Sequence, residues 1–253
     1  LKKNIKPLKL IMKKILITIL TLLTVSCNET PKKKVDQKEQ PSQKEWVILF
    51  DGKSFDGWHQ FNEAKMSSAW DIIDGAMVFD PSKQIEKKQN HDLVTDKEYT
   101  NFELSLEWNI AEGGNSGIFW GVKEGEQYGK PYTTGPEIQV LDNERHPDAL
   151  ANPKFHQAGA LYDMVQPTQD VCKAAGEWND VLLSIDYNTN KGSVTLNGVE
   201  IVTFPVSGEK WDALIANSKF SDWDHFAKFK TGKIGLQDHG DMVSYRNIKI
   251  REL

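Results

Sequence analysis

The chain has 253 residues, enough to bury the core of one large domain. Its formal net charge is −5, whereas proteins that bind a phosphate backbone carry a basic excess, so nucleic acid is not expected as a partner. The 8 Trp, 6 Tyr and 11 Phe are numerous enough to fill a β core and still leave rings for stacking on sugars.

The N-terminus has the pattern of an export signal. Residues 12–27, MKKILITILTLLTVSC, combine two lysines, a short apolar run and Cys27. The run is shorter than the roughly 20 apolar residues that a spanning helix needs. Its TVSC ending resembles a bacterial lipobox, in which Cys27 is acylated and anchors the protein to the membrane. We therefore expect residues 1–27 to be a signal peptide with a lipobox, with 1–11 not translated. We expect an exported bacterial lipoprotein in the periplasm or outer membrane; a plain cleaved signal peptide is the alternative.

A tether and a single domain follow. Residues 28–45, NETPKKKVDQKEQPSQKE, are charged and almost free of apolar side chains, which predicts a flexible linker. Residues 46–253 contain neither a second linker nor a repeat, and we expect them to form one domain.

Strand patterns run through this domain. In chain order, strands are expected within 46–50, 69–80, 102–110, 116–122 and 135–142, and in further segments up to residue 253. Asp74-Gly75 and Asn197-Gly198 are hairpin turn signals. A short helix is expected within 208–220. Many short strands with few helices predict an all-β fold of two packed antiparallel sheets, a jelly roll or lectin-like sandwich.

The stretch GPEIQVLD (135–142) places acids and an amide on a strand. Glu137 and Gln139 share one face because side chains alternate, and a β-bulge after Val140 would bring Asp142 to the same face. The spacing resembles the E-I-D-x-x-E strand of laminarinase-type glycosidases, with Gln and Asp in place of the second and third acids. It predicts a strand that faces sugar; a hydrogen-bonded polar patch is the alternative.

Three other stretches gather polar and aromatic side chains. One is the end of a strand in GKIGLQDHGD (232–241), another is AEGGNSGIFWG (111–121), and the third is a long loop after residue 142. The candidates they supply are Gln237, Asp238, His239, Asn115, Ser116, Trp120, His156 and Tyr162. Asp238 and His239 could hold a divalent metal, although an adjacent Asp and His are no specific metal signature. There is no P-loop, G-x-G-x-x-G or H-E-x-x-H, so no nucleotide is expected.

Together these stretches resemble one family. The segments LFDGKSFDGWHQ, GPEIQVLD, GALYDMVQP and GKIGLQDHGDMVSYRNIKIREL, in this order within 45–253, are similar to the 3-keto-disaccharide hydrolase domain family. The resemblance implies a concanavalin-like jelly roll, a secreted and often lipidated bacterial protein, and action on glycosides oxidised to a ketone at C3.

The implied chemistry suggests roles for the candidates. A C3 ketone acidifies the C2 proton, so a base can remove it, the aglycone leaves C1 by elimination, and water adds afterwards. We expect Glu137 to be the base and His239, with or without a divalent metal, to polarise the C3 carbonyl. Asp142 or His156 is expected to be the acid. Expected substrate contacts are hydrogen bonds from Asn115, Ser116, Gln139 and Gln237, and stacking on Trp120 or Tyr162.

Two other functions are compatible with the sequence. A carbohydrate-binding module without catalysis would use the same fold and aromatic residues. A laminarinase-type endo-glycosidase would need the acid that Gln139 replaces. In each case the expected partner is a carbohydrate.

Overall fold

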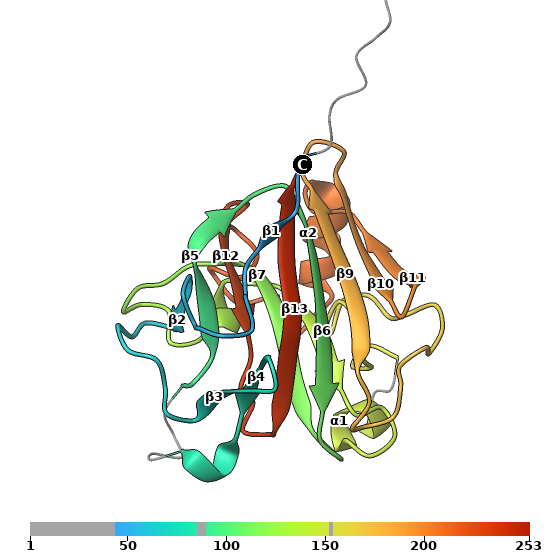
Figure 1. Ribbon diagram of the computed structural model, residues 1–253. Helices are drawn as coiled ribbons and strands as arrows, with labels where there is room; N and C mark the ends of the chain where they lie inside the picture. Colours follow the sequence, from blue (N-terminus) through green and yellow to red (C-terminus); the bar gives the residue numbers. More distant parts are fainter. Residues whose placement is uncertain (1–43, 85–89, 152–153) are drawn as a thin grey trace, which may run out of the picture. The chain divides into compact units, whose positions relative to one another are not determined.

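The computed structural model describes residues 44–84, 90–151 and 154–253 (Figure 1). The predicted signal peptide, the predicted lipidation site at Cys27 and nearly all of the predicted tether lie outside the described residues. Within the described part of the chain, no helix combines the length and apolar character needed to cross a membrane.

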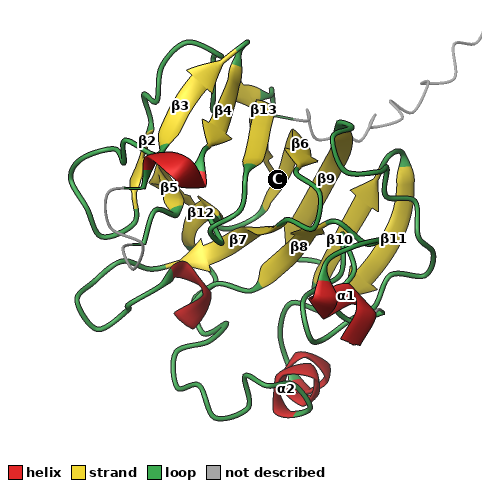
Figure 2. Ribbon diagram, turned by 90° about the horizontal axis from the view of Figure 1, so that it is seen from below, coloured by secondary structure: helices red, strands yellow, loops and turns green. Residues whose placement is uncertain are grey.

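The strands form two antiparallel sheets (Figures 1 and 2), which confirms the predicted all-β jelly-roll sandwich. In the larger sheet the order is β11 (Val199–Phe204), β10 (Lys191–Leu196), β9 (Asn179–Asp186), β6 (Phe102–Ile110), β13 (Val243–Glu252), β4 (Ala76–Phe79) and β3 (Trp70–Ile73), and β1 (Val47–Ile48) pairs with β13. In the smaller sheet the order is β2 (Trp58–Gln60), β5 (Leu93–Tyr99), β12 (Gly232–Leu236), β7 (Asn115–Val122) and β8 (Glu137–Leu141).

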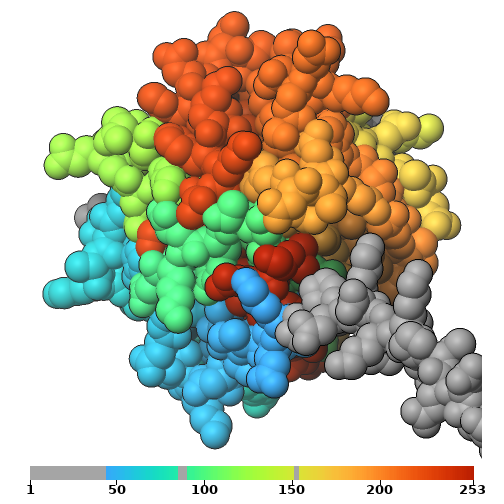
Figure 3. All heavy atoms as spheres, turned by 90° about the horizontal axis from the view of Figure 1, so that it is seen from above, coloured from blue at the N-terminus to red at the C-terminus, as the bar shows by residue number. Residues whose placement is uncertain are grey.

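The two predicted hairpin turns are confirmed. Asp74 and Gly75 join β3 to β4 with φ values of 50° and 76°, and Asn197 and Gly198 join β10 to β11 with 49° and 80°. Positive φ at both central residues is what a type I′ turn requires, and Asp-Gly and Asn-Gly adopt it at low cost. Figure 3 shows the red end of β13 next to the blue segment of β1, in agreement with the pairing of Val47 with Ile250.

Alternation along the strands separates the core from the outer faces. On β7 and β8, Ile118, Trp120, Ile138 and Val140 pack in the core between the sheets. The residues that alternate with them, such as Glu137 and Gln139, face the other side of the smaller sheet. The loops between the strands contain two helices, α1 (Pro147–Ala151) and α2 (Glu209–Ala216), and two 3₁₀ turns, η1 (Pro81–Lys83) and η2 (Pro131–Thr133). In Figure 2 the loops that contain η2, α1 and α2 lie below the smaller sheet. The helix expected within 208–220 is α2.

β8 is an edge strand whose open side is covered by the following loop. The amide of Gln139 donates to the Ala160 carbonyl (3.1 Å), the amide of Gly159 donates to the Gln139 carbonyl (2.8 Å), and the amide of Tyr162 donates to the Glu137 carbonyl (3.0 Å). The chain around Tyr162 is therefore fastened to the strand that carries Glu137.

Candidate active site

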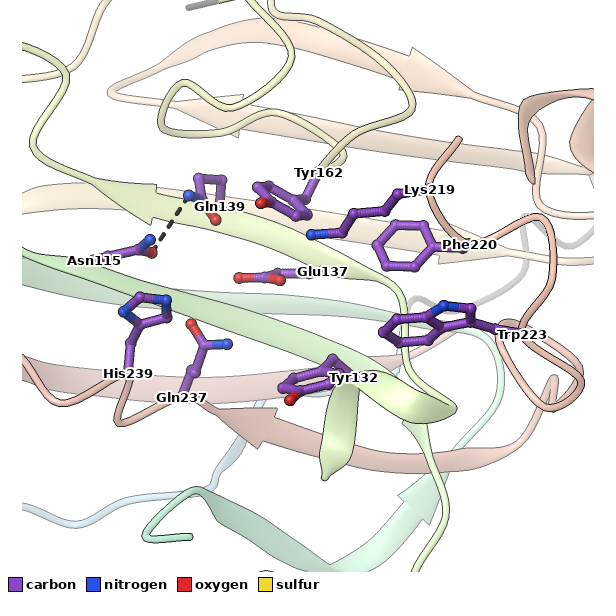
Figure 4. A pocket seen from close by; sticks show the side chains of 10 residues that line it. All are labelled: Asn115, Tyr132, Glu137, Gln139, Tyr162, Lys219, Phe220, Trp223, Gln237 and His239. Atoms are coloured by element: carbon purple, nitrogen blue, oxygen red, sulfur yellow. Dashed lines mark hydrogen bonds between the residues drawn. The ribbon is translucent and has the colours of Figure 1, made fainter. Parts of the chain in front are cut away.

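The outer face of the smaller sheet holds a cavity of about 290 Å³ (Figure 4). Side chains from β7 and β8 form its floor, the chain just after β12 forms one side, and the loops after β8, after α2 and at η2 form the rest. The residues that line it are Asn115, Tyr132, Glu137, Gln139, Tyr162, Lys219, Phe220, Trp223, Gln237 and His239. The predicted site residues Asn115, Glu137, Gln139, Tyr162, Gln237 and His239 thus meet in one cavity.

Glu137 lies on the cavity floor and is 8% exposed. Its carboxylate occupies the space above Gly117, where a Cβ would stand 2.7 Å from the carboxyl carbon. Burial raises the pKa of Glu137 to about 8; the positive charges of His239 and Lys219 oppose the rise, and Asp92 and Asp148 add to it. A carboxyl group with such a pKa can gain or lose a proton near neutral pH.

Two amide oxygens in the cavity have no hydrogen-bond partner within the described residues. The Gln139 amide nitrogen donates to Asn115 Oδ1 at 3.3 Å, but the buried Oε1 atoms of Gln139 and Gln237 accept nothing. An unpaired buried acceptor costs free energy unless a ligand or water donates to it. These two oxygens are therefore suited to accept hydrogen bonds from sugar hydroxyls.

His239 reaches the cavity from the turn after β12. Its backbone has a φ of 40°, in the left-handed region, and Gly240 follows at 85°. Its Nδ1 lies 3.7 Å from Asp241 Oδ2. Asp241 raises the pKa of His239, burial opposes the rise, and Glu137 adds to it. A positively charged imidazole is thus favoured beside the carboxyl group of Glu137.

Aromatic rings line the part of the cavity formed by the loops. The ring of Trp223 lies 5.9 Å from that of Tyr132 and 5.2 Å from that of Phe220. The sequence prediction missed these three residues and Lys219. The spacing in KFSDWDHF (219–226) could have marked an aromatic cluster, but no local pattern places it above β8.

The predicted position of Asp142 is wrong. β7 and β8 pair in an uninterrupted register from Asn115–Leu141 to Phe119–Glu137, so no bulge follows Val140. Asp142 instead accepts hydrogen bonds from the amides of Gly113 (2.7 Å) and Glu144 (3.0 Å) and from Arg145. Burial raises its pKa, but these hydrogen bonds outweigh burial and the net shift is downward. Asp142 is a structural carboxylate of the loop and does not line the cavity.

Three other predicted site residues also lie away from the cavity. Trp120 is 1% exposed and stacks on Phe204 in the core, so it offers no platform to a sugar. The hydroxyl of Ser116 is buried and within 2.6 Å of the Gln237 carbonyl and the Tyr245 hydroxyl. His156 lies behind Tyr162, with its two ring nitrogens 2.8 Å from Asp148 and 2.9 Å from Asp163. Neither its position nor its partners suit the predicted role as acid.

The possible metal ligands Asp238 and His239 do not form a metal centre with their neighbours. Asp238 Oδ2 accepts the His91 amide at 2.6 Å, and the Asp238 amide donates to Asp92 Oδ1 at 2.9 Å. Burial, followed by the charge of Asp238, raises the pKa of Asp92 to about 7. Among the described residues, no group of three or more His, Cys, Asp or Glu side chains is arranged to hold a metal ion.

The comparison with protein families decides the relationship. Residues 45–251 match the model of the 3-keto-alpha-glucoside-1,2-lyase-like domain. The chain belongs to this family. It is also 35% identical over 231 residues to the 3-keto-disaccharide hydrolase of Bacteroides thetaiotaomicron. The alignment covers 82% of this chain and 78% of that protein. These matches confirm the resemblance inferred from the sequence.

Solved structures support the same relationship. A glycosyl hydrolase candidate from Parabacteroides distasonis superposes with a TM-score of 0.75 and 31% identity, covering 82% of this chain and 94% of that one. A Bacillus subtilis protein of unknown function with a galectin-like fold reaches a TM-score of 0.51 at 10% identity, covering 82% and 94%. The second likeness concerns the fold alone and is consistent with a lectin-like sandwich.

Proposed function

We propose that the protein cleaves the glycosidic bond of 3-keto-glycosides or 3-keto-disaccharides, by elimination followed by hydration. One observation carries the proposal: among the described residues that line the cavity, Glu137 is the single carboxylate. Hydrolysis with two carboxylates needs a second such group about 5–10 Å away. Elimination from a 3-keto sugar needs one base, so membership of a 3-keto-glucoside lyase-like family fits this cavity.

The proposed reaction uses three kinds of side chain. Glu137 takes the proton from C2, and the electron pair moves onto the C3 oxygen, which His239 stabilises by hydrogen bonding. The enolate returns the pair, the C1–C2 double bond forms, and the bond from C1 to the aglycone oxygen breaks. Water then adds across the double bond, so the products are a 3-keto sugar and an alcohol. Asn115, Gln139 and Gln237 bind hydroxyl groups of the substrate, and Tyr162 lies beside its sugar ring.

A binding module without catalysis is the second candidate, and the burial of Glu137 argues against it. Ionising a buried carboxyl group costs free energy, which is why its pKa is raised. A module could bind hydroxyl groups with neutral amides alone. Strongly shifted groups in a cavity are characteristic of catalytic sites.

The direct test compares an oxidised substrate with its parent. We expect a 3-keto-disaccharide to be cleaved to 3-keto-glucose and the partner sugar, and the unoxidised disaccharide to remain intact, because only the ketone makes C2 acidic. Proton NMR follows both mixtures, and in D₂O it also reports whether solvent deuterium enters C2. Cleavage of the parent at a similar rate would refute the proposal.

The pKa of Glu137 predicts the pH dependence. As a base, Glu137 must be ionised, so kcat/KM should rise about tenfold per pH unit below pH 8 and level off above it. The measurement is kcat/KM for a 3-keto-glucoside between pH 5 and 9, with the melting temperature recorded at each pH. A rate that falls as the pH rises from 6 to 8 would contradict the role of Glu137 as the base.

We also propose that the protein is exported and lipidated on Cys27, as the pattern of residues 12–27 suggests. A signal peptide ending in a lipobox supports this location. Incorporation of a labelled fatty acid into the wild-type chain and not into a Cys27→Ser variant would be the expected result.

A further inference from the structure

The proposed reaction leaves one role without a residue. The aglycone oxygen needs a proton when its bond to C1 breaks, unless the aglycone is itself acidic. Asp142 and His156, the two acids expected from the sequence, do not line the cavity. The proton donors that do line it, apart from His239 and the base Glu137, are two tyrosines and Lys219.

The tyrosines are poor donors for this step. The hydroxyl of Tyr162 already donates to Asp148 Oδ2 at 3.1 Å. Burial raises the pKa of Tyr162, and the charge of Asp148 adds to the rise. Burial also raises the pKa of Tyr132, with a smaller contribution from Asp92. A phenol with a raised pKa gives up its proton less readily, so Lys219 is the stronger candidate.

Lys219 is held in place by a network of hydrogen bonds and ring contacts. Its backbone amide donates to Asp163 Oδ2 at 2.7 Å, and its ammonium nitrogen lies 4.0 Å from the centroid of the Tyr162 ring. That ring stacks on the His156 ring with 4.4 Å between the ring centroids, and His156 is hydrogen-bonded to both Asp148 and Asp163. The ammonium group is therefore positioned from the backbone and by a cation–π contact.

The position of Lys219 suits the leaving oxygen. In Figure 4 the imidazole of His239 lies on one side of the Glu137 carboxylate and the ammonium group of Lys219 on the other. Both charges act on Glu137, since both oppose the rise of its pKa. In a sugar, C2 lies between C1 and C3. When the C2 proton faces Glu137, the oxygens on C3 and C1 therefore lie on opposite sides of it.

We propose that Lys219 is the catalytic proton donor to the aglycone oxygen. The inference rests on the proposed elimination. As the bond from C1 to the oxygen breaks, the oxygen keeps the bonding pair and takes a proton from the ammonium group; the neutral amine regains a proton from water. The aglycone then lies toward Phe220, whose ring is 5.2 Å from the ammonium nitrogen, and toward Trp223.

The test varies the leaving group. Lys219→Met should lower kcat/KM for methyl 3-keto-glucoside at least about 100-fold, and for 4-nitrophenyl 3-keto-glucoside less than about 5-fold, because nitrophenolate leaves without a proton. Lys219→Arg keeps the charge but does not release a proton, so the same selective loss is expected. Lys210→Met, an exposed lysine on α2, is the matched control and should behave as wild type.

Each other outcome overturns the inference. Equal losses on the two substrates would mean that Lys219 acts by structure or by binding, and no loss would mean that it takes no part. Full activity of the Arg variant would show that charge alone suffices. If the wild type cleaves neither keto-glycoside, the proposed function itself fails, and the wild-type arm reports this separately from the variants.

Discussion

Glu137→Gln is expected to lower kcat for a 3-keto-glucoside by at least about 100-fold, because Gln has the size of Glu but cannot accept the C2 proton. The loss should be the same for methyl and 4-nitrophenyl aglycones, since proton removal from C2 precedes departure of either. Rates of cleavage followed by NMR, with Glu126→Gln at an exposed position as control, measure it. Near-normal turnover of Glu137→Gln would remove the base from the mechanism.

The same variant should become more stable than the wild type as the pH rises. The pKa of Glu137 is about 8 in the folded protein, well above its ordinary value of 4.5, so the folded state binds more protons between these values. The wild type therefore loses stability as the pH rises through this window, and a Gln side chain does not. Melting temperatures should be close near pH 4.5 and should favour the variant at pH 8, by roughly 2–4 °C for each kcal/mol. Equal melting temperatures at both pH values would contradict the raised pKa.

Gly117→Ala is expected to abolish most activity while the fold persists. The new Cβ would overlap the Glu137 carboxylate, which is the far end of a flexible side chain and can turn away. A base displaced by about 1 Å can cost about 100-fold in rate. The melting temperature should change little, because Gly117 does not have a positive φ.

A double-variant cycle shows whether Gly117 acts through Glu137. If it does, adding Gly117→Ala to Glu137→Gln should cause no further loss of rate, since the base is already absent. Gly129→Ala is the control, because a Cβ there meets nothing within 4 Å. Additive losses, or a Gly117→Ala variant with normal activity, would separate the glycine from the base.

The sequence predicted the face of the strand but not all its neighbours. Alternation in EIQVL was enough to place Glu137 and Gln139 together, because a buried strand leaves little freedom in side-chain direction. The prediction of a bulge after Val140 was wrong, because the β7–β8 register is regular and Asp142 accepts hydrogen bonds from loop amides instead. For β7 the burial of all eight residues hides which face is which, so Trp120 was assigned to the wrong side.

Three of the four missed residues come from a distant part of the chain, and the fourth, Tyr132, lies just before β8. Lys219, Phe220 and Trp223 follow α2, some 80 residues after β8, and Tyr132 belongs to η2. Their position above β8 depends on how the loops fold back over the sheet. Such long-range packing has no period in the sequence, which is why the aromatic and lysine residues above β8 could not be predicted.

The loop fastened along β8 has a second consequence, for association between molecules. An uncovered edge strand presents free amides and carbonyls on which a strand of another chain can pair, and such pairing starts aggregation. Here Gly159, Ala160 and Tyr162 occupy those groups on β8. The segment that brings Tyr162 to the cavity therefore also prevents β8 from pairing with a strand of another molecule. Shortening this segment would open the site and would also expose an edge strand that promotes aggregation.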